Sequence, residues 1–247
     1  MNYRQQLANK YLIGNGVEFG ALHNPVKVDS NQAKVLYADK YSKQKLIKLF
    51  PELKKVATDI VETDIYFDLN KGLKEYCKLQ KCASNFNFYI ANHVIEHLIN
   101  PLRFLDNLHF IMKDGDRLYL ALPDKEYTFD KNRILTNWKH LYEEYLNNTS
   151  QLSEEHIREF IFNVTPLEHR REYYSQLRES YQNWFKRQII KREQSNRSIH
   201  VHVWNQKSFD YFLNKAIKTL KLKFEILEKV NSQTNKHEII YILQKKL

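Results

Sequence analysis

Residues 11–25 read Tyr11-LIGNGVEFGALHN-Pro25 and hold three of the five glycines in a chain of 247 residues. Glycine is favoured where a backbone turns sharply or approaches another group closely. Val17-Glu18-Phe19 predicts a short buried strand, and Gly20 with Ala21 predicts the turn that leaves it. The stretch therefore predicts the first strand of an α/β sheet, with a turn that faces a ligand.

A carboxylate follows the second apolar run. Residues 35–38 are apolar and end at Asp39, nineteen residues beyond Gly20. In open α/β sheets, the turn after the first strand lies against a nucleotide cofactor, and an acidic residue after the second strand accepts from its ribose hydroxyls. The spacing therefore predicts a ribose-bearing cofactor. The nicotinamide fingerprint GxGxxG is excluded, because Phe19 stands where the third glycine belongs.

Composition and charge narrow the class of protein. A hydrophobic content of 43% allows a sizeable core. The apolar runs are far shorter than the ~18 residues of a membrane span, and residues 1–12 lack the apolar stretch of a secretory signal, so we expect a cytoplasmic protein. Cys77 and Cys82 have no second cysteine pair and predict neither a disulfide framework nor a zinc site.

The formal charge of +10 suggests nucleic-acid binding as one hypothesis. The basic residues are spread along the chain, however, and suit an anionic small substrate equally well. We therefore expect a small anionic molecule, rather than nucleic acid, as the substrate. The sequence leaves the oligomeric state open.

The order of predicted elements indicates one α/β core with an insertion. Strands are predicted at 16–20, 34–38, 58–62, 86–91 and 116–122, alternating with helices at 42–50, 70–79 and 93–112. This alternation is typical of parallel strands joined by right-handed crossovers. Helices at 136–148, 153–163 and 167–195 then interrupt it, before a helix at 206–220 and a hairpin of 224–230 with 237–245. We predict a core of residues 1–123 and 200–247, and a helical insertion at 124–199 that covers the acceptor site.

Several motifs resemble class I S-adenosylmethionine-dependent methyltransferases. They are Glu18-Phe19-Gly20 on the first strand, Asp39 after the second, Asn92-HVIEHL after the fourth, and the terminal hairpin. Five blocks are similar to a bacterial subgroup encoded among glycosyltransferases in polysaccharide loci: Gly16-VEFGALHNP, Tyr89-IANHVIEHLINP, Leu122-PDKEYTFD, Thr136-xxx-His140 and His200-VHVW. The resemblance implies a Rossmann-like sheet of seven strands, mostly parallel with the last antiparallel, and S-adenosyl-L-methionine as cofactor.

The resemblance also implies which residues hold the cofactor. Gly20 and Ala21 would pass under its methionine part, and Glu18 would orient the loop or the ammonium group. The other implied positions are Asp39 for the ribose, Asp64 and Ile65 for the adenine, and Asn92 and His93 over the sulfonium. Leu22 departs from the family, which has a second glycine there, so we expect residues 22–25 to bend differently.

The acceptor side is predicted from position along the chain. Ligands of open α/β sheets collect at the carboxyl ends of the strands, where the insertion begins. The catalytic candidates are His97, His202, Asp130 and His140, and the substrate-binding candidates are Lys125 and Arg133. His97 lies one turn after His93 and could be either a base or a buried structural histidine.

We weighed two metal sites: the histidine pair 93 and 97, which lacks the HExxH order, and His200 with His202 beside Asp124 or Asp130. We predict no metal site, because neutral histidines beside a pocket more often form hydrogen bonds.

These residues predict an O-methyltransferase. Its acceptor would be a capsule or lipopolysaccharide glycan, or the nucleotide-linked, phosphate or phosphoramidate precursor of one. A hydroxyl acceptor needs a base such as histidine, whereas an oxyanion would need only Lys125 or Arg133 to orient it. The alternatives are an RNA methyltransferase and a methyltransferase-like binding protein without turnover.

Overall fold

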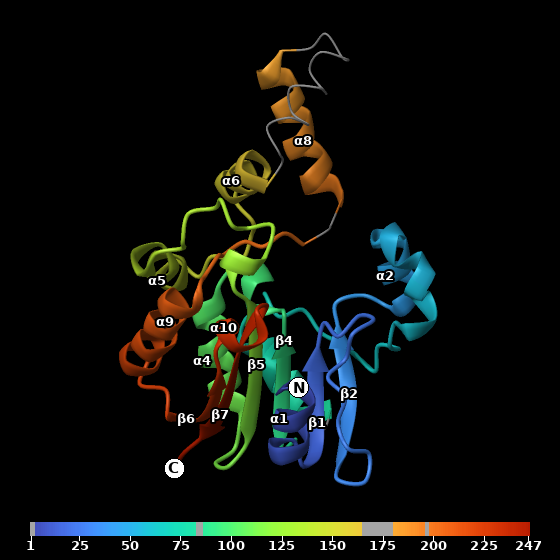
Figure 1. The fold of residues 1–247 in the computed structure, drawn as a ribbon, viewed down its shortest axis with the longest axis vertical. Helices are drawn as coiled ribbons and strands as arrows, with labels where there is room; N and C mark the ends of the chain where they lie inside the picture. Colours follow the sequence, from blue (N-terminus) through green and yellow to red (C-terminus); the bar gives the residue numbers. More distant parts are fainter. Residues whose placement is uncertain (1–2, 83–85, 165–179, 196–197) are drawn as a thin grey trace.

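A seven-stranded sheet forms the centre of the protein (Figure 1). The computed structural model describes residues 3–82, 86–164, 180–195 and 198–247, and within them the strand order is β3-β2-β1-β4-β5-β7-β6. The strands are β1 (Gly14–Phe19), β2 (Ala33–Asp39), β3 (Ile65–Tyr66), β4 (Phe88–Asn92), β5 (Arg117–Pro123), β6 (Phe224–Val230) and β7 (Glu238–Lys245). The first five pair in parallel, and β7 runs antiparallel to both of its neighbours. The predicted fold class is confirmed.

Helices surround the sheet and extend beyond one end of it. They are α1 (Tyr3–Tyr11), α2 (Lys43–Leu49), α3 (Leu73–Cys82), α4 (Pro101–Ile111), α5 (Trp138–Leu146), α6 (Glu154–Val164), α8 (Tyr181–Ser195), α9 (Gln206–Thr219) and α10 (Ser232–Asn235), with short 3-10 turns η1 (Pro51–Asp59), η2 (Ile95–His97) and η3 (Lys125–Tyr127). Figure 1 shows α6 and α8 beyond the end of the sheet where β4 and β5 finish. Residues 167–179 of the predicted helix 167–195 lie outside the described residues.

The two faces of the sheet are covered by different helices. On β4, Tyr89 and Ala91 belong to a core with residues of α3, α4 and α9. Phe88 and Ile90 point to the other face and pack with Leu7 and Ala8 of α1. Burial on both faces explains why the central strands are almost continuously apolar.

Two sequence predictions fail locally. The third strand was expected at 58–62, but residues 51–59 form the η1 turn, and β3 pairs with β2 only at Ile65 and Tyr66. The β-branched residues at 58–61 favour a strand only where a neighbouring strand is present, because β-propensity depends on context. The helix expected at 93–112 divides into η2 and α4, because Pro101 keeps Asn100 out of the helical region (φ −131°, ψ 81°).

Gly16 is required by a close approach between β1 and β4. A Cβ atom at this position would lie 1.9 Å from Cε2 of the fully buried Phe88. We expect Gly16→Ala to lower the free energy of unfolding by about 1–3 kcal/mol, because the ring must shift within a packed core. Urea denaturation measures this.

Gly72→Ala is the matched control, because nothing lies within 4 Å of its Cβ position. Its unfolding free energy should change by less than about 0.5 kcal/mol. Equal stability of the two variants would contradict the packing argument.

Within the part of the chain that the structure describes, no helix has the length and apolar character needed to cross a bilayer.

Candidate active site

A cavity of about 530 Å³ opens at the carboxyl ends of β1, β2 and β4. The elements up to the segment after β4 contribute Gly20, Asp39, Asp68, His93 and His97, among other residues. The elements after β5 contribute Leu152, Ile157, Ser198, Ile199 and Val201. A second cavity, of about 490 Å³ between α6 and α8, is lined by none of the predicted site residues.

The turn after β1 has a left-handed backbone. Gly20 has φ +60° and lines the cavity, with only Val94 near its Cβ position, at 3.5 Å. Leu22 also lines the cavity and has φ +49°, a region that costs a side-chain-bearing residue about 1–2 kcal/mol. Leu22 therefore holds the backbone conformation that a glycine would adopt at this position.

Glu18 stabilises this turn through a buried hydrogen bond. Its carboxylate is fully buried, and both of its oxygens accept from the backbone N–H of Val26 at 3.1 Å. Burial raises the pKa of Glu18 from its ordinary 4.5 to about 8, although the Val26 hydrogen bond and the Arg4 charge oppose the shift. At neutral pH the carboxyl group is therefore protonated and orients the loop as a neutral group.

This pKa predicts how stability depends on pH. Between pH 4.5 and 8 the folded protein keeps a proton that the unfolded chain releases, so the Glu18 contribution to the unfolding free energy falls as pH rises. Glu18→Gln removes this contribution. We expect the variant to gain more than about 1.4 kcal/mol relative to the wild type between pH 5 and 8.5, because the shift exceeds one pKa unit. Urea denaturation of both proteins at the two pH values measures it, and parallel pH profiles would contradict it.

Two carboxylates line the side of the cavity next to β2 and β3. Asp39 ends β2, and its Oδ1 accepts from the Tyr41 N–H at 3.0 Å. Burial raises the pKa of Asp39 above its ordinary value. Asp68 follows β3, accepts from the Asn70 N–H at 3.1 Å and pairs with Lys40 at 3.2 Å. A carboxylate can accept about four hydrogen bonds, so both groups can accept further ones from a ligand.

Asp64 is not in this cavity. Its side chain accepts from the Tyr37 N–H at 2.8 Å, because Asp64 precedes β3 instead of following it. Ala21, Ile65 and Asn92 are also not among the residues that line the cavity. The sequence prediction placed β3 too early in the chain. Had the strand been predicted to end at Tyr66, Asp68 would have been the carboxylate that follows it.

His93 and His97 both line the cavity, but their contacts differ. His93 has φ +56°, and its Nε2 lies 2.8 Å from Glu238 and 3.2 Å from Arg4. The His97 Nδ1 lies 2.8 Å from the carbonyl oxygen of Ile199, to which it must donate. The Nε2 of a neutral His97 therefore carries the lone pair. Burial lowers the pKa of His97, and this outweighs the opposing effect of Glu96.

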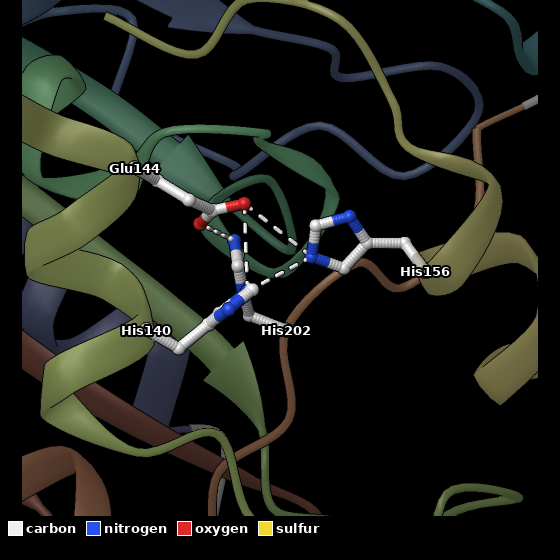
Figure 2. Close-up of side chains that lie close together, drawn as sticks. All are labelled: His140, Glu144, His156 and His202. Atoms are coloured by element: carbon white, nitrogen blue, oxygen red, sulfur yellow. Dashed lines mark hydrogen bonds and ion pairs between the residues drawn. The ribbon is translucent and has the colours of Figure 1, made fainter. Parts of the chain in front are cut away.

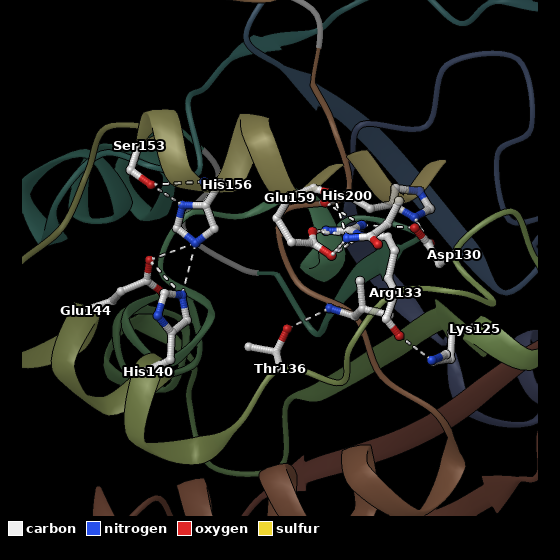
Figure 3. Close-up of polar contacts among 12 residues, drawn as sticks. Lys125, Asp130, Arg133, Thr136, His140, Glu144, Ser153, His156, Glu159 and His200 are labelled. Atoms are coloured by element: carbon white, nitrogen blue, oxygen red, sulfur yellow. Dashed lines mark hydrogen bonds and ion pairs between the residues drawn. The ribbon is translucent and has the colours of Figure 1, made fainter. Parts of the chain in front are cut away.

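A largely buried ion network joins Asp130, Arg133, Glu159 and His200 (Figure 3). Asp130 accepts from His200 Nδ1 at 2.5 Å and from Arg133 at 2.9 Å, and Arg133 also pairs with Glu159. The His200 ring meets the His97 ring edge to face, with centroids 4.7 Å apart. Asp130 thus orients His200, a residue that the sequence prediction considered only as a metal ligand.

The predicted substrate-binding residues have structural contacts instead. The Arg133 side chain is 1% exposed, and the Lys125 ammonium group donates to the Arg133 carbonyl oxygen. Neither residue lines the cavity. They join the segment after β5 to α6 and to residues 198–204, so neither side chain lies where we predicted that it would orient an anionic acceptor.

His140 and His202 belong to a separate cluster with Glu144 and His156, two residues that the sequence prediction missed. His202 is enclosed, does not line the cavity, and has its pKa lowered by burial to about 3. Its ring is therefore not placed to act as the base at this cavity in this arrangement. Glu144 could have been found from the sequence, because it follows His140 by four residues and therefore lies on the same helix face. His156 could not, because it lies on another helix.

Together, the left-handed turn, the carboxylate after β2 and the histidines after β4 define a Rossmann-like enzyme that binds a ribose-bearing cofactor. The family of the methyltransferase domain matches residues 21–210, and the chain belongs to it. S-Adenosyl-L-methionine is the cofactor that the sequence resemblance implies. Gly20, Asp39 and Asp68 fit it, because they place a close backbone turn and two acceptors around one cavity with Leu46, Phe50 and Phe67.

Solved structures are similar to this chain at low sequence identity. A zinc-dependent alcohol dehydrogenase from Rhodobacter sphaeroides has a TM-score of 0.51 and 12% identity, over 97% of this chain and 87% of that chain. A methyltransferase from Clostridium acetobutylicum has a TM-score of 0.45 and 8% identity, over 97% and 87%. The CurJ carbon methyltransferase has a TM-score of 0.45 and 9% identity, over 97% and 50%, so this chain spans half of its length. No curated protein matches the chain.

Proposed function

We propose that this enzyme methylates a hydroxyl oxygen of a glycan or a glycan precursor, with His97 as general base. The observation that carries the proposal is the bond from His97 Nδ1 to the Ile199 carbonyl, which leaves the Nε2 lone pair available on a ring that lines the cavity. The lowered pKa keeps this imidazole neutral at physiological pH, and a neutral imidazole can accept a proton.

S-Adenosylmethionine supplies an electrophilic methyl group on a sulfonium. The chain must hold the acceptor oxygen about 3 Å from that methyl and remove the hydroxyl proton. In this proposal Gly20 and Asp39 bind the cofactor at one end of the cavity. Asp68 lies on the adenine side, in the role that the sequence analysis assigned to Asp64. His97 holds the acceptor proton on Nε2.

The lining of the acceptor side favours a hydroxyl over an oxyanion. Leu152, Ile157, Ile199 and Val201 are apolar, and Ser198 is neutral. Lys125 and Arg133, which would have neutralised a phosphate or phosphoramidate, do not line the cavity. A neutral sugar hydroxyl therefore suits this wall better than a charged oxygen.

The glycan class rests on the five sequence blocks shared with the polysaccharide-locus subgroup. In the same proposal, the product is a capsule or lipopolysaccharide glycan, and the enzyme acts in the cytoplasm, where sugar nucleotides are made. We also propose that residues 124–199 cover the acceptor.

A screen with methyl-labelled cofactor tests the proposal. The acceptors are neutral sugars, sugar nucleotides, sugar phosphates, intact polysaccharide and RNA, with mass spectrometry to place the methyl group. We expect one methyl on a sugar hydroxyl. Methylated RNA, or methyl on a phosphate oxygen, would overturn the proposal. Binding of S-adenosylhomocysteine without any methylated product would favour a binding protein instead.

A further inference from the structure

Four potential metal ligands converge outside the cofactor cavity (Figure 2). His140 and Glu144 come from consecutive turns of α5, His156 from α6, and His202 from the segment that leads into α9. The four ligand atoms all lie within 4.8 Å of one another. We propose that these residues bind one zinc ion.

Three of four distances between these ligand atoms lie close to the edges of a tetrahedral zinc site, and the fourth is shorter. His140 Nε2 lies 3.0 Å from His156 Nε2, and Glu144 Oε1 lies 3.4 Å from each of them. Glu144 Oε2 lies 3.3 Å from His202 Nε2. With zinc–nitrogen bonds of about 2.0–2.1 Å, the edges of a tetrahedron are about 3.3–3.4 Å. The donor set of three imidazoles and one carboxylate also suits zinc.

Without an ion, the cluster contains an unsatisfied buried carboxylate. The Glu144 side chain is 7% exposed, and neither oxygen has a hydrogen-bond partner among the described residues. Buried polar groups normally have partners, and each exception needs an explanation. A metal ion at the centre of the four atoms satisfies both the carboxylate and the imidazole lone pairs.

The surroundings of His156 fit a ligand role. Its Nδ1 lies 2.8 Å from the Ser153 hydroxyl, which fixes the ring and leaves Nε2 facing the cluster (Figure 3). Ligating histidines usually bind such a partner through their other ring nitrogen. The competing account is a metal-free polar cluster, in which His202 Nε2 donates to the Ile99 carbonyl at 3.2 Å.

The ion would have a structural role. Four protein ligands leave no open position for a substrate or water, which is typical of structural zinc. His202 directly follows Val201, which lines the cofactor cavity. The ion would therefore hold α5 and α6 against the segment that supplies one wall of that cavity.

Zinc binding to the purified protein of residues 1–247 tests this. After removal of metal with a chelator, addition of zinc chloride should give one ion per chain by elemental analysis. Saturation at about 100 times the dissociation constant should raise the melting temperature by about 5–10 °C. Cobalt in place of zinc should give the intense visible absorption of four-coordinate cobalt. None of these readouts depends on methyl transfer, so they can fail independently of the proposed function.

Three variants separate this site from adventitious binding. Glu144→Gln should weaken zinc binding by more than about 100-fold, and Ser153→Ala by about 10–100-fold. His23→Ala removes an exposed histidine outside the cluster and should bind zinc as the wild type does. No stoichiometric binding by the wild type, or equal binding by Glu144→Gln and His23→Ala, would overturn the proposal. If Glu144→Gln does not fold, Ser153→Ala and the cobalt spectrum of the wild type decide it.

Discussion

His97→Ala should lower kcat by about 10²–10⁴-fold while leaving cofactor affinity unchanged. Loss of a general base has this magnitude when the acceptor is a hydroxyl group. The wild-type pH–rate profile should show an acidic limb below pH 6.5, because burial lowers the pKa of His97 and protonation fills the Nε2 lone pair. The groups facing His97 are Glu96, which opposes this shift, and His200 and His93, which add to it. The limb should be absent in the variant.

Rates at saturating cofactor between pH 5 and 9 measure this. His109→Ala is the matched control, because His109 does not line the cavity and its ring nitrogen Nε2 accepts from the Lys223 N–H on another side of the protein core. The His109→Ala variant should keep the wild-type kcat and the acidic limb of the pH–rate profile. A wild-type rate in His97→Ala would remove His97 from the chemistry. A lower rate with an unchanged limb would give it a positioning role.

Asp39→Ala should weaken binding of S-adenosylhomocysteine by about 10–150-fold. The reason is the loss of charge-assisted hydrogen bonds to the ribose, worth about 1.5–3 kcal/mol. Asp68→Ala should also weaken binding, because Asp68 lines the same side of the cavity. Isothermal titration calorimetry measures both affinities.

Asp64→Ala is the control for this pair. Its carboxylate accepts from the Tyr37 N–H outside the cavity, so affinity should stay within about twofold of the wild type. The reverse order, with Asp64→Ala weakened and Asp68→Ala unchanged, would restore the role that the sequence suggested. No heat with the wild-type protein would contradict cofactor binding itself.

The sequence predicted best where one local pattern determines the structure. The runs around β4 and β5 are apolar on both faces, and the left-handed turn at Gly20 favours glycine, so these elements could be located. The edge strand β3 could not, because two residues carry little periodicity and their pairing depends on β2. Its late position also explains why Asp64 was chosen instead of Asp68.

The acceptor side could not be predicted because its contacts join distant residues. Asp130 meets His200 across 70 residues, and His97 meets Ile199 across 102. Lys125 and Arg133 have the charge for anion binding, but only the packing of α6 shows that Arg133 is enclosed with Glu159. Glu144 and His156 likewise come together only when α5 and α6 fold against one another.

The place of β7 has a consequence for synthesis on the ribosome. The last strand of this sequence, Glu238–Lys245, pairs with β5 on one side and β6 on the other. Until it emerges, β5 is an edge with unpaired backbone groups and an apolar surface, which is a template for aggregation. A nascent chain stalled before residue 238 can therefore carry every cavity residue and still be a substrate for chaperones, because no earlier segment that the structure describes pairs with β5 on that side.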